Sequence, residues 1–380
     1  AGQRPPEADL RTERRTAGLL PSPFRFRPCG SSGIPISSLL PLTGQQADEL
    51  CVLRSTWTDN PNHGPALLLM NNGTILPTRP SMGSWISYGL GTLNRNLPSF
   101  IVLAPHTPYA GGQVWGSDFL PGAYQGTRVV PGTQPVANIQ RRVGSEELQR
   151  LELGLLAGIN RRHQLRRSDD PELAARIQSF ETAFGMQREM PDVFDLSDET
   201  EQTFRSYGLQ PGSTAGFGWQ CLVARRLAER GVRFIQLYHR DWDHHGAVKA
   251  HAEGTAKEVD QGVAALIADL KQRDMLKDTI IVFGSEFGRT PMAQGDGRDH
   301  HLAGFTMWFA GGGFKPGFSY GATDEFGYHA VENVVSVHDI HATLLHQLGI
   351  DYQRFHYKFQ GLDMRLTGVE PCRVVHELLV

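Results

Sequence analysis

The sequence predicts an α/β fold, with a largely parallel central sheet and helices on both of its faces. Two observations predict this class. The second half of the chain alternates between helical and strand-like segments. Its strand-like segments, 232–239, 279–286 and 305–313, are apolar runs without regular polar alternation. Such runs are typical of strands that are covered on both faces, as in parallel sheets flanked by helices.

The first part of the chain supplies two more strands. Residues 50–57 and 99–105 are apolar and contain β-branched side chains, which favour a pleated strand. A short turn or helix is expected before them, at 33–41. The segment between the two strands is rich in Gly, Asn and Pro, and we expect a long ordered loop with a helical piece there.

A long insertion of helices and loops is expected over about 106–215. It contains a helix at 146–167 and ends in a polar stretch at 188–215, which Pro and Gly punctuate as in a surface excursion. We expect the insertion to belong to a single domain that covers 30–380. The preceding residues, 1–29, are rich in Pro, Arg and Glu and are expected to be irregular.

Helices separate the strands of the second half of the chain. They are expected at 221–231, 250–273 and 338–350. In the longest, five apolar side chains recur on one face: Val259, Val263, Leu266, Ile267 and Leu270. A single helix between two buried strands is typical of a right-handed crossover. We therefore expect 232–239, 279–286 and 305–312 to be neighbours in one sheet.

Composition excludes several classes of protein. The chain has 380 residues, 40% of them hydrophobic, which is enough for a sizeable core in one large domain or two smaller ones. Its formal net charge of −3 gives no global electrostatic case for nucleic-acid binding. No run of about 18 apolar residues is present to span a membrane. The four cysteines lie far apart without C-x-x-C spacing, which argues against a cysteine-based zinc site.

Polar clusters follow the predicted strands of the second half. They contain Asp243, His244 and His245, then Glu286 and Arg289, and then, in the loop before the next strand, Asp299, His300 and His301. In sheets of this kind ligands bind beyond the carboxyl ends of the strands. Carboxylates mixed with imidazoles are the ligands that a divalent metal ion requires. The clusters therefore predict a metal site, with solvated turns as the alternative.

Other candidate residues fit structural roles. His338, His341 and His346 lie in a helical pattern and are expected on the helix surface or in the core. Ser285 lies in G-S-E-F-G, which is not the G-x-S-x-G elbow of serine hydrolases. Cys29 lies in PCGSS, which lacks the C-x-P-S-R pattern of sulfatases that oxidise a cysteine to formylglycine.

Three motifs together resemble one bacterial family. They are GSEFGRTP at 284–291, GRDHH at 297–301 and FTMWFAGGGFKPG at 305–317. The family is labelled domain of unknown function 1501, is placed in the alkaline phosphatase superfamily and is described as sulfatase-like. The resemblance covers nearly all of residues 30–368 and implies an alkaline-phosphatase-like α/β domain with metal ions at the strand ends.

The resemblance also implies the roles of individual residues. As metal ligands it implies Asp243, His245, Glu286, Asp299 and His300. His244 stands where family members commonly have threonine, so it could compete as a ligand. As contacts for a substrate or anion it implies Arg54, His63, Arg289 and His301. A second role for Arg289, equally open, is to hold Glu286 in place.

One departure from the family pattern bears on activity. Family members begin with an apolar strand and a G-G-P-S-x-x-D-x-F-D-x-K-P-like stretch, which would supply a metal-binding aspartate and a candidate serine nucleophile. The chain is expected to start just after that stretch. The catalytic nucleophile is therefore expected upstream of residue 1, and a central strand is expected to be missing.

The expected function is a metal-dependent hydrolase of phosphate or sulfate esters, with little activity in this shortened form. Two divalent ions, of Zn, Mn or Ca, would serve as cofactors, and a small-molecule or saccharide ester would be the substrate. One alternative is a non-catalytic metal- or carbohydrate-binding protein that keeps the fold. Another is an isomerase or phosphotransferase on the same metal frame. The resemblance implies a periplasmic or secreted location, and the sequence predicts no oligomeric state.

Overall fold

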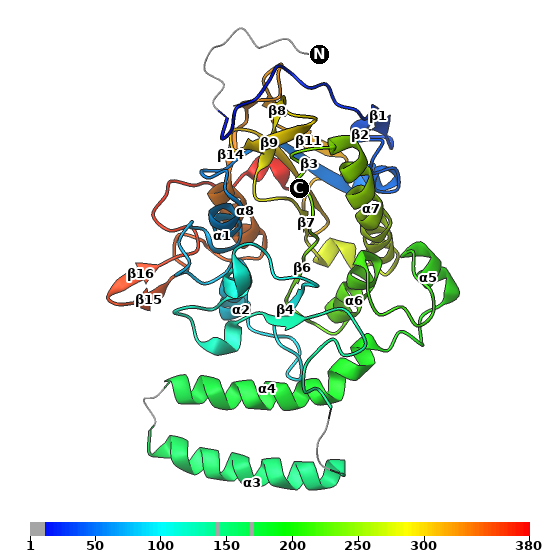
Figure 1. Cartoon of the computed structure of the whole chain (residues 1–380). Coiled ribbons are helices and arrows are strands. Elements are labelled where there is room, and N and C mark those ends of the chain that lie inside the picture. The colour runs from blue at the N-terminus through cyan, green and yellow to red at the C-terminus, as the bar shows by residue number, and fades with distance from the viewer. Residues whose placement is uncertain (1–11, 141–143, 168–170) are drawn as a thin grey trace.

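The computed structural model describes residues 12–140, 144–167 and 171–380, which form a mixed α/β structure (Figure 1). The α-helices are α1 (His63–Asn72), α2 (Met82–Leu90), α3 (Glu146–Leu165), α4 (Pro171–Phe194), α5 (Glu201–Ser206), α6 (Phe217–Glu229), α7 (Val248–Gln272) and α8 (Val337–Gln347). The 3-10 helices are η1 (Thr43–Glu49), η2 (Gly111–Trp115), η3 (Gly122–Tyr124), η4 (Leu276–Asp278) and η5 (His376–Leu378).

The strands are short. They are β1 (Phe26–Cys29), β2 (Ile34–Ser37), β3 (Leu50–Trp57), β4 (Phe100–Leu103), β5 (Thr127–Val129), β6 (Phe234–Leu237), β7 (Ile281–Phe283), β8 (Gly288–Gln294), β9 (Gly297–His301), β10 (Phe305–Ala310), β11 (Phe318–Tyr320), β12 (Ala322–Thr323), β13 (Ala330–Glu332), β14 (Val335–Ser336), β15 (Tyr357–Phe359) and β16 (Leu362–Met364).

Two sheets form the centre of the molecule. In the larger sheet β11, β3, β10 and β7 follow one another, and β14 also pairs with β3. β10 runs antiparallel to β3 and β7, whereas β11 and β14 run parallel to β3. The smaller sheet has the order β5-β4-β6 and is wholly parallel. The α/β class is confirmed, but the predicted largely parallel central sheet is not, because the central strands are mixed in direction and divided between two sheets.

Helices cover both faces of the smaller sheet. In β4, Ile101 and Leu103 pack into the same apolar cluster as α6. The alternating residues Phe100 and Val102 pack into another cluster with Leu68 of α1. Because successive side chains of a strand point to opposite faces, this strand is buried on both sides, as its apolar run predicts.

Helices also cover both faces of the larger sheet. In β3, Leu50 and Val52 pack with α7, and Cys51 and Leu53 pack with α8. Figure 1 shows the result, with α6 and α7 on one side of the strands and α1, α2 and α8 on the other.

The prediction that 232–239 and 279–286 are neighbours is wrong. β6 lies in the smaller sheet and β7 in the larger one, and only β7 and β10 are neighbours, in antiparallel orientation. The prediction treated α7 as a crossover within one sheet. However, α7 has apolar side chains on two sides, with Ala265 in the core of the smaller sheet and Val263 and Ile267 in that of the larger one. It therefore connects two sheets.

The predicted insertion has an outer and an inner part. No residue of α3 is buried, and Figure 1 shows α3 at the outer edge, with α4 between it and the rest of the molecule. By contrast, the end of α4 and the segment after it contribute to the core with Met190, Val193, Leu196, Phe204 and Tyr207. The prediction of a surface excursion at 188–215 is therefore wrong, because its widely spaced apolar residues are buried against α6.

The N-terminal segment is held along the β8–β9 hairpin. Leu19 forms a bridge with Met292, and the Ala17 amide donates to the Ala293 carbonyl. β1 then pairs with β2, so a strand occupies 34–37 of the segment 33–41, and the predicted turn is limited to the residues on either side of it, at 33, 38–39 and 41. Residues 1–11 of the predicted irregular segment lie outside the described residues. Among the helices that the structure describes, none is long and apolar enough to cross a membrane.

Candidate metal centre

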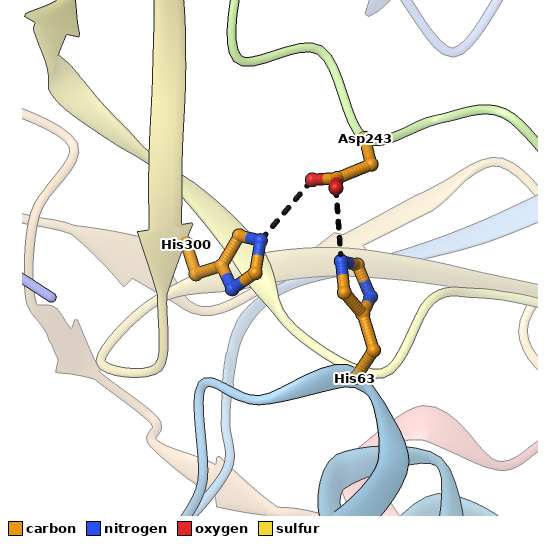
Figure 2. A group of neighbouring side chains, drawn as sticks. All are labelled: His63, Asp243 and His300. Atoms are coloured by element: carbon orange, nitrogen blue, oxygen red, sulfur yellow. Dashed lines mark hydrogen bonds and ion pairs between the residues drawn. The ribbon is translucent and has the colours of Figure 1, made fainter. Parts of the chain in front are cut away.

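Five side chains from four distant segments meet in one cluster, which we call the His–Asp cluster. Its members are His63 at the start of α1, Asp243 and His245 in the loop after β6, Glu286 after β7, and His300 on β9. Figure 2 shows three of them, His63, Asp243 and His300, pointing toward one another from separate elements. Ligand atoms of these three all lie within 4.8 Å of one another.

The β8–β9 hairpin positions His300. The loop predicted at 297–301 is wrong, because Gly295 and Asp296 form a two-residue turn and the following residues return as β9 in a hairpin. Along β9, Asp299 and His301 are buried on one face and His300 points to the other. Gly297 is required for this packing, since a Cβ atom there would lie 2.1 Å from the carbonyl carbon of His245.

Three possible ligand atoms face one another at the centre of the cluster. Oδ1 of Asp243 lies 2.9 Å from Nε2 of His245 and 3.1 Å from Nε2 of His300. The two Nε2 atoms are 3.0 Å apart.

The other ring nitrogen of each histidine contacts an oxygen acceptor. Nδ1 of His300 lies 2.6 Å from the carbonyl oxygen of Pro61, and Nδ1 of His245 contacts Oε1 of Gln294. A neutral imidazole has one N–H, so a ring that donates through Nδ1 has a lone pair at Nε2. In this tautomer both lone pairs point toward the carboxylate of Asp243. A cation among the three atoms would satisfy all of them, and histidines that bind metals usually donate through their other nitrogen in this way.

His63 connects the two carboxylates of the cluster. Its Nδ1 lies 2.6 Å from Oε1 of Glu286, and its Nε2 lies 3.3 Å from Oδ2 of Asp243. That Nε2 atom is buried and has no hydrogen bond. Its place at the first turn of α1 also sets both carboxylates near the positive end of the helix dipole, which favours negative charge.

Charges within the cluster hold its carboxylates ionised. Burial alone would raise the pKa of Asp243, but the hydrogen bond and charge of Arg289 hold it well below its usual range. Burial likewise opposes ionisation of Glu286, yet the hydrogen bond from His63 leaves its pKa lowered. Burial and the nearby Arg289 charge lower the pKa of His300, which favours its neutral form.

Arg289 contacts Asp243 and keeps one donor group unused. Its Nη2 donates to Oδ1 of Asp243 at 2.7 Å, whereas its buried Nη1 has no hydrogen-bond partner. The guanidinium also lies over the ring of Phe287, 5.6 Å from its centroid. Arg289 was predicted to contact an anion or to hold Glu286, and in the structure it holds Asp243 instead of Glu286.

Asp299 lies behind His245 and is almost fully buried, with 1% of its surface exposed. Its Oδ2 accepts a hydrogen bond from the Arg14 amide at 2.7 Å. Its Oδ1 has no hydrogen bond and lies 4.0 Å from Nδ1 of His245. Asp299 is therefore next to the ring nitrogen of His245 that does not face Asp243.

Three of the predicted site residues lie elsewhere. Arg54 is exposed on β3 and donates to the carbonyl of Gly321. His301 is buried on the other face of β9 from His300, with Nε2 at 2.5 Å from the Tyr328 carbonyl. His244 contacts the carbonyl of Asp241 through its Nε2. The structure brings none of these three into contact with the His–Asp cluster.

Several residues of the site have no signal in the sequence. Gln294 contacts His245 from the hairpin, and Tyr109 stacks on His63 with ring centroids 4.6 Å apart. Phe287 lies against both His63 and His300. His63 itself was predicted as a substrate contact, yet it lies between the two carboxylates. Phe287 stands within the GSEFGRTP motif, whereas chain folding alone reveals Gln294 and Tyr109.

Comparison with known proteins gives distant structural similarities. This chain is similar to the PsFucS1 sulfatase from Pseudoalteromonas sp., at 12% identity and TM-score 0.37, covering 82% of this chain and 62% of that chain. It is similar to Ps i-CgsB at 12% identity and TM-score 0.40, covering 82% and 66%. It is similar to the phosphonate monoester hydrolase SpPMH from Silicibacter pomeroyi at 13% identity and TM-score 0.39, covering 87% and 72%.

The chain thus spans less than two thirds of the first two of these proteins, and TM-scores below 0.5 do not establish a shared fold. No curated protein matches the sequence significantly. A family model, by contrast, matches residues 2–379, almost the whole chain. The predicted family is therefore confirmed: the chain belongs to the family described as Protein of unknown function (DUF1501).

Proposed function

We propose that the His–Asp cluster binds divalent metal and that the protein is a metal-dependent hydrolase of phosphate or sulfate esters. One observation carries this function. The facing atoms of Asp243, His245 and His300 lie within 3.1 Å of one another, and each imidazole has an oxygen acceptor at its other nitrogen. Imidazole and carboxylate together suit zinc and similar divalent ions.

The residues offer two metal positions. Asp243, His245 and His300 would hold the first ion. His63 and Glu286 would hold the second, with Oδ2 of Asp243 3.3 Å from Nε2 of His63. We propose Asp299, expected as a ligand, as the residue that orients His245 from behind. When bound, such ions polarise ester oxygens and lower the pKa of bound water.

The protein contributes a binding site for the negative charge of an ester. Nη1 of Arg289 is a buried donor without a partner, while Nη2 is fixed by Asp243. A guanidinium fixed in this way binds phosphate or sulfate oxygens well, because its donors match their geometry. Arg289 therefore serves as the anion contact in the proposed site. The periplasmic or secreted location implied by the resemblance stays a prediction.

We expect little turnover from residues 1–380. The G-G-P-S-like stretch that would supply a serine nucleophile is not found in this sequence. Ser285 has its hydroxyl in contact with the cluster, donating to Oε2 of Glu286 at 2.8 Å. Loss of a covalent nucleophile that acts together with metal ions lowers the rate by orders of magnitude.

The experiment measures bound metal and ester hydrolysis in the same samples. Residues 1–380 and a version extended upstream through the G-G-P-S-like stretch are supplied with Zn²⁺, Mn²⁺ or Ca²⁺ and assayed on aryl phosphate and aryl sulfate. Both should bind metal and only the extended version should turn over. The variant Asp243→Asn should lose metal, and the matched control Asp363→Asn, at an exposed Asp–His pair, should keep it.

The outcomes separate the candidate functions. Absence of bound metal in both versions would contradict the proposed site. Bound metal without hydrolysis by either version would favour the non-catalytic binding protein. Equal metal-dependent turnover by both would place the nucleophile within residues 1–380, and Ser285→Ala would then test the hydroxyl next to Glu286.

A further inference from the structure

Helix α3 carries an apolar stripe that no described residue buries. The stripe consists of Leu148, Leu151, Leu155 and Ile159, whose spacing of three, four and four residues places them on one face. They are 49%, 66%, 68% and 55% exposed, in that order. Scattered apolar residues are normal on a surface, but four in a continuous row usually indicate an interaction site.

The stripe points away from the rest of the molecule. The half-buried residues of α3 recur on a different face, at Gln149, Leu153, Ala157, Asn160 and Gln164. This face meets α4, as the hydrogen bond of 2.8 Å between the Gln149 and Gln187 side chains shows. α4 in turn separates α3 from the body (Figure 1). A partner could therefore approach the stripe without contact with the sheets.

Charge is distributed unevenly along the stripe. Glu147 flanks it in the first turn of α3. At the other end Arg162 and Arg166 continue the same row, three and seven residues after Ile159. Among the residues that the structure describes, none of these three forms an ion pair. The helix is therefore acidic where the stripe begins and basic where it ends.

We propose that the stripe binds α3 of a second copy of this protein in antiparallel orientation. A two-fold axis across the middle of α3 would place the stripe of each copy on that of the other, because a two-fold contact uses the same patch twice. It would bring Glu147 of one copy near Arg162 of the other. Parallel pairing would instead place Arg162 beside Arg162, and like charges are unfavourable.

The two α3–α4 hairpins would then form a layer of four helices, with the two copies of α3 in the middle and each α4 between α3 and the body of its own copy. A membrane surface fits the stripe less well. Helices that lie on membranes carry Lys and Arg along the polar face, whereas the first turn of α3 carries Glu146 and Glu147.

The first experiment compares the oligomeric state of the full chain and of the double variant Leu151→Glu, Leu155→Glu by sedimentation from about 1 to about 100 μM. The wild type should be a dimer, and the variant a monomer with a dissociation constant raised at least about 1,000-fold. A matched control adds the same charges at exposed apolar residues elsewhere, as Leu93→Glu, Val369→Glu, and should stay dimeric. Metal content should be equal in all three.

The second experiment tests the orientation. Arg162→Glu should raise the dissociation constant about tenfold, and Glu147→Arg added to it should restore dimerisation. Failure of the second change to restore would contradict antiparallel pairing. A wild type that stays monomeric over the whole range would overturn the proposal. If that monomer binds anionic vesicles through Leu151 and Leu155, a membrane surface is the partner instead.

Discussion

Histidines lie at both ends of helix α1, one on α1 itself and two on α8, and they contact different kinds of partner. At its first turn the two nitrogens of His63 face the carboxylates of Glu286 and Asp243. At its last turn His338 and His341 of α8 contact main-chain carbonyls, those of Gly73 at 3.0 Å and Met70 at 2.8 Å. At the first turn, carboxylate oxygens and imidazole nitrogens of the His–Asp cluster converge on one another. At the last turn, the imidazoles donate to helix carbonyls that would otherwise lack donors.

The partners of these histidines indicate their roles better than their burial does. Both groups are buried or half-buried imidazoles near the same helix, so burial does not distinguish them. The partners do, because only carboxylates and lone pairs that face one another need a cation. The α1 helix thereby connects a proposed functional group with a structural one, and changes at its two ends should affect different properties.

The largest effect is expected at Asp243. Asp243→Asn removes the negative charge that His245, His300 and Arg289 contact, and should lower metal affinity about 1,000-fold. This loss exceeds the roughly 10- to 100-fold effect of changing a residue that only supports a metal ligand. Isothermal titration with Zn²⁺ checks this value. A loss smaller than about tenfold would show that Asp243 is not a ligand.

His341→Ala should act on stability instead. It removes a buried ring and the donor to the Met70 carbonyl, so the free energy of unfolding should fall by about 3 kcal/mol in urea denaturation. Metal affinity should stay within about threefold of the wild type. A parallel loss of metal affinity would mean that the two ends of α1 are coupled.

A smaller change in metal affinity is expected at Gln294, whose Oε1 contacts Nδ1 of His245. Gln294→Ala should lower metal affinity about 10- to 100-fold, since partners of liganding histidines typically contribute this much. Gln294→Glu should keep or raise it. Gln353→Ala, at an exposed glutamine, is the matched control. Equal metal affinities in the wild type and all variants would show that His245 is not a metal ligand.

The smallest effect concerns pH. Burial lowers the pKa of His341 to about 4 from about 6.5. Between these values the unfolded chain binds a proton that the folded protein does not, so stability falls as pH falls. From about pH 7 to about pH 5.5 the loss should be about 1 kcal/mol. Unfolding of His341→Gln, which keeps a donor for Met70, should lack this part of the pH dependence. An unchanged pH dependence would contradict the buried neutral form.

The sequence allowed most elements to be predicted, but not how the sheets divide. Strands such as β3 and β4 follow from their apolar runs, and α7 follows from its spacing of apolar side chains. The division between β6 and β7 could not be predicted, because either sheet arrangement buries the same apolar residues. Likewise the buried residues after α4 lie in a mostly polar stretch, and its few, widely spaced apolar residues did not indicate that they are part of the core.

For the site, residues next to strand ends were easier to find than their partners. Asp243, His245, Glu286 and His300 follow or lie on strands and were predicted together. His63 was predicted in the site, but as a substrate contact. Its place between the two carboxylates depends on the packing of α1, about 180 residues away in sequence from Asp243. His301 illustrates the opposite error, since a strand alternates its side chains and only one of two adjacent histidines can face the cluster.

The central claim is that the converging atoms of Asp243, His245 and His300 hold a divalent ion. The most direct measurement is an anomalous-difference map from crystals of the protein grown with Zn²⁺. The account predicts a zinc peak about 2.0–2.1 Å from Nε2 of both histidines and at a similar distance from Oδ1 of Asp243. A map with no peak there, and with the two Nε2 atoms still 3.0 Å apart, would contradict it.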